Sequence, residues 1–174
     1  MRRFSVNKNV FFAVLFVFVF IAAPVIPTGA YAALKKGQPA PPIKVVTLSG
    51  QSVTLANYRG YVLLLDFFAS WCHPCNNSIL HLVEINQRYG RDGLQILGLS
   101  LDEDRDELID FIRPLKVNYP VALADEELQI RYGLRSIPTV FLINKRGIIV
   151  DIFLGNTDDS SSSLETSIKK LLAE

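Results

Sequence analysis

The stretch from Leu65 to Cys75 reads LDFFASWCHPC and decides the fold. It begins inside Val62–Phe68, an apolar run that only Asp66 interrupts, and such runs are typical of strands buried on both faces of a sheet. From Pro74 to Tyr89 the apolar residues recur at helical spacing. The stretch therefore predicts a buried strand, a short turn and a helix, with the cysteine pair where the helix begins.

The two cysteines of the chain, Cys72 and Cys75, suit a reactive pair better than a structural bridge. The stabilisation given by a disulfide grows with the logarithm of the loop that it closes, and this loop is very short. A cysteine at a helix N-terminus instead feels free backbone N–H groups and the positive end of the helix dipole, which favour the thiolate. The spacing predicts Cys72 as the nucleophile and Cys75, one turn into the helix, as the resolving thiol.

Other uses of the two cysteines fit less well. A zinc site needs four ligands, or three and a water, whereas the chain offers two thiols, His73 and the distant His81. Covalent haem attachment needs a histidine directly after the second cysteine, where this chain has Asn76. No metal and no cofactor is therefore expected beyond the Cys72–Cys75 disulfide. Two interpretations of His73 stay open: it adds positive charge that makes the pair more oxidising, or it is a solvated turn residue.

Asp66 is unusual because it stands in the middle of an apolar strand. Burial of an unpaired carboxyl is costly and raises its pKa, since desolvation penalises the charged form. Asp66 precedes Cys72 by six residues, which suits a proton acceptor for the resolving Cys75, directly or through water. The alternative is a carboxyl that points to solvent from a strand edge.

Beyond this stretch, strand and helix patterns alternate along the chain. Predicted strands are 43–48, 52–55, 62–68, 94–101, 121–123, 139–144 and 148–155. Predicted helices are 74–89, one capped by Asp102 or Asp104 and ending at Ile112, one from Asp125 to Tyr132, and a last one capped at Ser162 after a polar linker, Asp158–Ser163. This order predicts an α/β domain with a mixed central sheet and helices on both faces. Pro138 belongs at the first position of its strand, where a cis bond is plausible.

Composition excludes several classes of protein. The chain has 174 residues, 49% hydrophobic and 20% charged, with a formal net charge of +1, which gives no electrostatic footprint for nucleic acid. Residues 1–32 hold three basic groups and no acid, which leaves 15 basic and 17 acidic groups, a formal −2, for residues 33–174. The near-neutral net charge is therefore the sum of a basic N-terminal segment, residues 1–32, and a slightly acidic remainder, residues 33–174.

The first piece has the order of a secretory signal. A basic stretch, Met1–Asn9, leads into the uncharged run Val10–Ala23, and small residues at Ala30 and Ala32 follow. This predicts cleavage after Ala32, so that residues 1–32 are a signal peptide and residues 33–174 the functional domain. The alternative is an uncleaved anchor, although the apolar stretch reaches spanning length only by running through a proline. Both outcomes place the domain outside the cytoplasm, where disulfide chemistry is permitted.

Over residues 35–172 the chain resembles thioredoxin, and more closely the extracytoplasmic thioredoxin-like reductases of the TlpA and ResA type. The resemblance rests on the lead-in Gly37–Pro41, the stretch from Leu65 to Cys75, an additional strand and helix between Pro114 and Tyr132, and the run Tyr132–Thr139. It implies a thioredoxin fold with an N-terminal β-hairpin extension and an inserted strand and helix.

The resemblance also implies roles for individual residues. By it Cys72 attacks and Cys75 resolves, Asp66 matches the buried acid, Pro138 matches the cis-proline, Ile137 offers backbone to the substrate, Trp71 shields the site and Pro74 limits flexibility. The chain departs from the family pattern in three places. Ser78 replaces a frequent glutamate, Leu80 replaces a proline, and Leu97-Gly98-Leu99 lacks the lysine that thioredoxins place near the acid. The missing lysine predicts an Asp66 that is more easily protonated.

These features predict a monomeric thiol-disulfide oxidoreductase that reduces disulfides in exported proteins, with apocytochrome c among the candidate substrates. A membrane thiol-disulfide protein would return its electrons, and no nucleic acid is expected as a partner. The missing glutamate at Ser78 weakens the cytochrome c expectation. Three alternatives remain: a net oxidase or isomerase, suggested by His73; a peptide-binding module around Pro138 without redox turnover; and peroxide reduction, suggested by the lead-in. Copper delivery fits poorly because few ligands are present.

Overall fold

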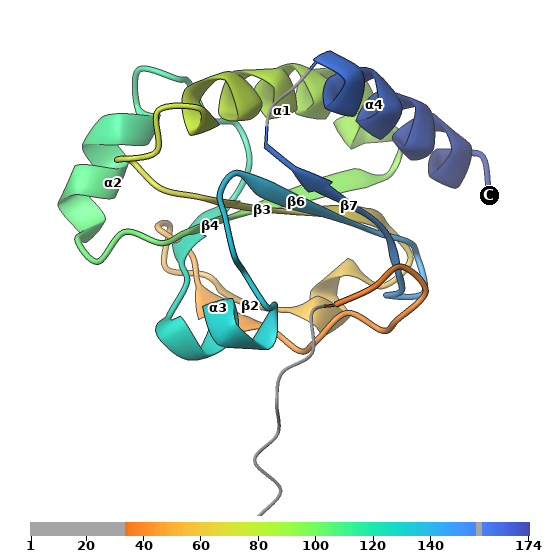
Figure 1. Cartoon of the computed structure of the whole chain (residues 1–174), viewed down its shortest axis with the longest axis horizontal. Helices are drawn as coiled ribbons and strands as arrows, with labels where there is room; N and C mark the ends of the chain where they lie inside the picture. Colours follow the sequence, from red (N-terminus) through yellow and green to blue (C-terminus); the bar gives the residue numbers. More distant parts are fainter. Residues whose placement is uncertain (1–33, 156–157) are drawn as a thin grey trace, which may run out of the picture. The chain divides into compact units, whose positions relative to one another are not determined.

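The computed structural model describes residues 34–155 and 158–174, so the predicted signal segment 1–32 lies outside the described residues. Within them the larger sheet has five strands in the order β5-β4-β3-β6-β7 (Figure 1). Its strands are β3 (Val62–Phe68), β4 (Leu94–Ser100), β5 (Val121–Leu123), β6 (Thr139–Ile143) and β7 (Ile149–Leu154). The first three run parallel, whereas β6 is antiparallel to β3 and to β7. The predicted mixed sheet is confirmed.

Helices cover both faces of this sheet (Figure 1). They are α1 (Cys75–Tyr89), α2 (Arg105–Ile112), α3 (Glu126–Arg131) and α4 (Asp158–Leu172). Helices α1, α2 and α4 contribute buried side chains to one core, and α3 contributes to the other. None of the helices in the described part of the chain is long and apolar enough to cross a membrane.

Strand β3 separates the two cores because alternate side chains of a strand point to opposite faces. Val62, Leu64 and Phe68 belong to the core under α1 and α4, whereas Leu63 and Phe67 belong to the core on the α3 side. All seven residues of β3 are buried, as predicted from its apolar sequence. Strand β3 therefore leads from the buried sheet into the turn that contains the cysteine pair.

The N-terminal part of the domain contacts both edges of the sheet. A short hairpin of β1 (Lys44–Val46) and β2 (Ser52–Thr54) is followed by a 3-10 turn, η1 (Leu55–Tyr58). Just after β1, the Leu48 N–H donates to the Val121 carbonyl of β5 at 2.7 Å. Before β1, the Gly37 N–H donates to the carbonyl of Ile149, the first residue of β7, at 2.8 Å. Residues 37–48 thus bond to the two outermost strands.

Aspartates begin two of the helices. The Asp104 carboxylate accepts from the N–H groups of Asp106 at 2.7 Å and Glu107 at 3.0 Å, and so caps α2. Asp125 caps α3 in the same way through Leu128 N–H. Of the two caps proposed for α2, Asp104 is correct, which leaves Asp102 for a different contact.

The predicted polar linker Asp158–Ser163 is wrong, because α4 already begins at Asp158 and Ser162 lies inside it. Serine-rich stretches have low helix propensity, but propensity is a weak preference that tertiary packing overrides. Leu164, Ile168 and Leu171 are buried against the sheet and hold the helix in place. A 3-10 turn, η2 (Gly90–Asp92), follows α1, and the left-handed residue that turns the chain is Gly93, with φ 103°.

Candidate active site

The cysteine pair lies at the junction of β3 and α1 as predicted, but Cys75 does not lie one turn into the helix. Cys72 follows β3 in a short turn and Cys75 is the first residue of α1; the two form a disulfide with an S–S distance of 2.04 Å. The Cys72 N–H donates to the Ala69 carbonyl at 3.2 Å, and the Cys75 N–H donates to the Cys72 carbonyl at 3.0 Å. Cys72 is 6% exposed and Cys75 is fully buried. An incoming substrate therefore reaches Cys72 first.

The helix terminus at this pair favours a thiolate. Pro74 is the N-cap of α1, no side chain caps the terminus, and its first turn contains no acidic residue. The positive end of the dipole and the free N–H groups are therefore not neutralised by a carboxylate. Ser78, which replaces the glutamate expected from the resemblance, is buried. His73 is exposed, and both interpretations of it stay open.

Asp66 is fully buried and accepts no hydrogen bond from any described residue. Its side chain points to the same face of β3 as Leu64 and Phe68, towards the core that also contains Cys72 and Cys75. Desolvation raises the pKa of Asp66 to about 7. The predicted buried carboxyl is confirmed, and the solvent-facing alternative is wrong.

Apolar groups fill the place where a partner for Asp66 could stand. In the register of β3 and β4, Asp66 lies opposite Gly98. A Cβ on Gly98 would meet Phe68 Cε1 at 3.0 Å, Val121 Cγ2 at 3.1 Å and Tyr119 Cε2 at 3.3 Å. A lysine at this position would require these side chains to shift, and the glycine leaves Asp66 without a cationic neighbour there.

Tyr119 is a residue near the site that the sequence did not reveal. Its hydroxyl is buried and unpaired among the described residues. Desolvation, and secondly the charge of Asp66, raise the pKa of its phenol well above the usual value. Tyr119 precedes a short strand in the sequence, and only the packing of β5 beside β4 brings its ring over Gly98. No sequence pattern could have indicated this contact.

Pro138 lies directly before β6, the strand beside β3, and not at its first position as predicted; the bond between Ile137 and Pro138 is cis. Because Thr139 pairs with Phe67, this proline lies near the end of β3 that leads to the cysteines. Trp71 and Ile137 line a hollow of about 580 Å³ together with apolar side chains of Leu101, Ile130 and Leu134. The structure thus brings together Trp71 and Ile137, two of the three residues predicted to bind the substrate, the third being Pro138. The Trp71 side chain is 69% exposed at its rim.

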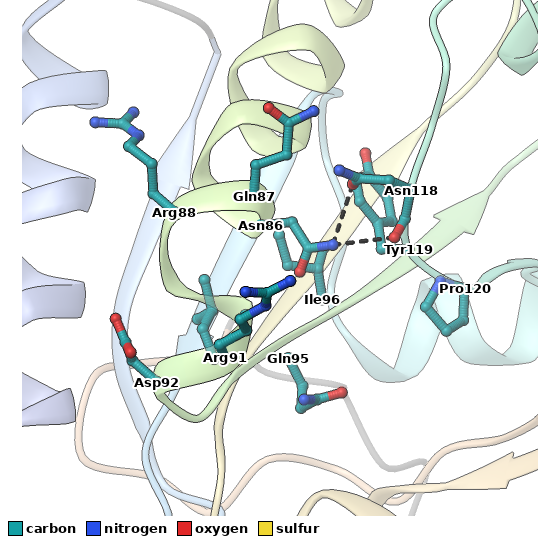
Figure 2. A pocket seen from close by; sticks show the side chains of 12 residues that line it. Asn86, Gln87, Arg88, Arg91, Asp92, Gln95, Ile96, Asn118, Tyr119 and Pro120 are labelled. Carbon is teal, nitrogen blue, oxygen red and sulfur yellow. Dashed lines mark hydrogen bonds between the residues drawn. The ribbon is translucent and has the colours of Figure 1, made fainter.

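A second hollow, of about 710 Å³, lies at the C-terminal end of α1 and the start of β4 (Figure 2). Asn86 donates from its side-chain amide to the Asn118 carbonyl at 3.0 Å and to Asn118 Oδ1 at 3.1 Å across one side of it. Tyr119 also lines this hollow, but neither cysteine does. It is separate from the disulfide.

Asp102 holds the turn that precedes the cysteines. It is 6% exposed, and its carboxylate accepts from the Ser70 N–H at 3.0 Å and from the Ser70 hydroxyl at 2.7 Å. The Ser100 hydroxyl donates to Asp102 Oδ2, the oxygen that also accepts from the Ser70 N–H at 3.0 Å. Sequence reasoning considered Asp102 only as a helix cap. Within the described residues, no three His, Cys, Asp or Glu side chains are grouped to hold a metal.

Comparison with known proteins agrees with this geometry. Residues 36–152 match the model of the AhpC/TSA family. The chain belongs to this family. It is 30% identical over 136 residues to the thiol-disulfide oxidoreductase ResA of Bacillus thuringiensis (strain Al Hakam), with 78% of each chain covered. It is 26% identical over 128 residues to ResA of Bacillus subtilis (strain 168), covering 73% of this chain and 72% of the relative.

Solved structures of similar proteins share the fold. A protein of Chlorobium tepidum, provisionally described as the thiol:disulfide interchange protein DsbE, superposes with a TM-score of 0.76 at 29% identity, covering 80% of this chain and 99% of its own. A provisionally described protein disulfide isomerase of Bacteroides thetaiotaomicron gives a TM-score of 0.76 at 25% identity, covering 81% and 92%. This member of the AhpC/TSA family is therefore a thioredoxin-like thiol-disulfide oxidoreductase with the pair Cys72 and Cys75.

Proposed function

We propose that this AhpC/TSA-family oxidoreductase reduces disulfide bonds in exported proteins outside the cytoplasm. The observation that carries disulfide exchange is the arrangement of the cysteines: the slightly exposed Cys72 lies just before an uncapped helix N-terminus, with the buried Cys75 behind it. The signal-like order of residues 1–32 supports a location outside the cytoplasm. The relatives named ResA and the structure described as DsbE support the reaction.

The reaction transfers two electrons in two exchange steps. The Cys72 thiolate attacks one sulfur of the substrate disulfide, a mixed disulfide forms, and the other substrate sulfur leaves as a thiolate that takes up a proton. Cys75 then loses its proton and attacks Cys72 Sγ. This forms the Cys72–Cys75 disulfide and releases the second substrate thiol. The substrate disulfide is reduced and the cysteine pair is oxidised.

Asp66 is suited to take the proton of Cys75. It lies in the same core as both cysteines, and its pKa of about 7 lets it accept a proton at neutral pH. Among the described residues no cation pairs with Asp66, so none holds it permanently as a carboxylate. Because the Asp66 oxygens have no hydrogen bond to Cys75 in the described structure, the transfer runs through a water molecule or after a small movement.

The hollow beside Trp71 is suited to the polypeptide on either side of a substrate cysteine. Ile137, next to the cis-proline, offers backbone groups to an extended chain, and Ile130 is 46% exposed on the other wall. The oxidised pair must then be re-reduced by a dithiol, for which a membrane thiol-disulfide protein is the proposed donor. Apocytochrome c is one candidate among exported substrates, and His73 favours the alternative of net oxidation if it is charged.

Two variants, each with its own assay, test this function. Cys72→Ser should lose disulfide reduction with insulin as the substrate, because the attacking sulfur is gone. Cys75→Ala should keep the first step and accumulate mixed disulfides on Cys72, which mass spectrometry of proteins trapped in the cell envelope would identify. Reduction that survives in Cys72→Ser would contradict the proposal.

The direction of the reaction is decided by the reduction potential of the pair. A reductase should lie near thioredoxin at about −270 mV, whereas an oxidase lies nearer to about −120 mV. Equilibration of the purified chain with glutathione at known ratios measures this value. A value near the oxidase end would assign the chain to net disulfide formation.

A further inference from the structure

The parallel register of two strands brings Asp102 beside the turn that carries Cys72. Phe68 and Ser100 are paired at the ends of β3 and β4, so the residues two positions further on, Ser70 and Asp102, emerge side by side. The Ser70 N–H and hydroxyl both donate to Asp102, and the Ser100 hydroxyl donates to it from the strand end. Three donor groups therefore hold the Asp102 side chain against this turn.

This carboxylate hydrogen-bonds to Ser70, which precedes Cys72 by two residues. Two residues span at most about 7 Å of extended chain, and the turn closed by the Cys72 N–H and the Ala69 carbonyl makes the path shorter. Asp102 is 6% exposed, so water and salt screen its charge weakly. A buried negative charge near a thiol disfavours the thiolate.

We propose that Asp102 is a positioning residue that fixes the turn before Cys72, and that its buried charge favours the disulfide form of the pair and thereby makes the pair more reducing. The inference rests on the proposed function and deepens it, because it names a residue that tunes the reduction potential of the pair. A less stable thiolate means a less stable reduced form, and a protein with a less stable reduced form gives its electrons away more readily.

Apart from the buried Asp66, the other charged residues near this turn are exposed. Asp102 itself lines a hollow together with the exposed charged residues Lys44, Glu103, Asp125 and Glu126. On the side of Trp71 the exposed Arg135 lines the other hollow, beside Glu126. His73 is exposed between the cysteines. Solvent screens all of these charges, whereas Asp102 is shielded from it.

The test compares two aspartates two positions apart. Asp102→Asn keeps the shape of the side chain and removes its charge, so the pKa of Cys72 should fall by about half a unit to one unit. The equilibrium with glutathione should shift about two- to threefold towards the reduced protein. Asp104→Asn removes the same charge from the exposed cap of α2, and should lower stability while leaving both values unchanged. The pH dependence of iodoacetamide reaction with the reduced chain reports the pKa.

Ser70→Ala tests the same link with the opposite sign. Loss of the hydroxyl donor leaves the Asp102 charge less neutralised, so the pKa of Cys72 should rise and the equilibrium should shift towards the disulfide. This variant keeps the inference falsifiable if Asp102→Asn does not fold. Values for Asp102→Asn equal to those of Asp104→Asn, or no change in Ser70→Ala, would overturn it.

Failure of the inference is distinguishable from failure of the proposed function. If Asp102→Asn leaves the pKa of Cys72 unchanged while the unaltered chain still reduces insulin, the function stands and the role of Asp102 is wrong. If the unaltered chain does not reduce insulin, the function itself is wrong, whatever the Asp102 variants show.

Discussion

Asp66 carries an ionisable group into the core with no described partner to share its charge. Folding raises its pKa from the ordinary 3.8 to about 7, so between these values the folded chain binds more protons than the unfolded one. The free energy of unfolding therefore falls as the pH rises through this window, in all by roughly 4 kcal/mol at 1.36 kcal/mol per unit. Asp66→Asn should remove this loss and be more stable than the unaltered chain above pH 7, as urea unfolding of the oxidised proteins from pH 4 to pH 8 would measure.

The matched control for this variant is Asp110→Asn, whose side chain is 73% exposed on α2. It should keep the pH slope of the unaltered chain. A pH slope that persists in Asp66→Asn would mean that Asp66 does not cause it.

Asp66→Asn should also slow the resolution of mixed disulfides by Cys75 at pH 7 by about 10²-fold, because the proton acceptor is lost.

The local sequence pattern predicted those site residues whose surroundings are set by the strand or helix to which they belong. Asp66 could be placed in the core because its neighbours are apolar, and Cys72 at a helix start because the helical pattern follows it. Asp102 and Tyr119 could not be predicted, because their contacts with Ser70 and over Gly98 depend on the register of separate strands. Which side chains meet across a sheet depends on how its strands pair, and a single sequence does not show this pairing.

At the scale of elements, Glu165 joins α4 to α1. It accepts from the Tyr89 hydroxyl at 2.6 Å, and pairs with Arg88 at 3.0 Å and with Lys169 at 3.2 Å. The Tyr89 hydrogen bond first, and the two cations next, lower the pKa of Glu165 to about 2. The stabilisation is therefore present above the ordinary value of 4.5 and is lost as the pH falls towards 2.

Glu165→Gln should accordingly lower the free energy of unfolding at pH 7 and have no effect at pH 2. The cost should be only about 0.5–1 kcal/mol, because the group is open to water and screened by salt. Thermal unfolding at both pH values, with and without 1 M salt, measures it. An equal loss at pH 2 would show that packing, and not charge, joins the two helices.

Elements were predictable where their patterns were strong. Helix α1 and strands β3 and β4 have long apolar patterns and appear with their limits nearly unchanged. The hairpin is shorter than predicted, and α4 starts earlier, because the ends of these elements are decided by packing against the rest of the domain. The sequence therefore predicted the presence and order of the elements better than their boundaries.

At the scale of the whole molecule, residues 37–48 bond to the two outermost strands of the sheet. Unpaired strand edges are templates for association with other chains. We expect a variant that starts at Ser49 to form concentration-dependent oligomers, whereas the chain that starts at Ala33 stays monomeric. Sedimentation of both proteins at several concentrations measures this, and a monomeric variant that keeps its fold would contradict the expectation.

This arrangement also bears on how the domain acquires its structure. Gly37 emerges early in the chain, but its bonding partner Ile149 belongs to the last strand. Contacts between residues so distant in sequence form slowly, because the intervening chain must be ordered first. The outer strands consequently stay open to wrong partners until the final stage of folding, when such intermediates are prone to aggregate. The late pairing of residues 37–48 would therefore limit the yield of correctly folded protein rather than the stability of the finished domain.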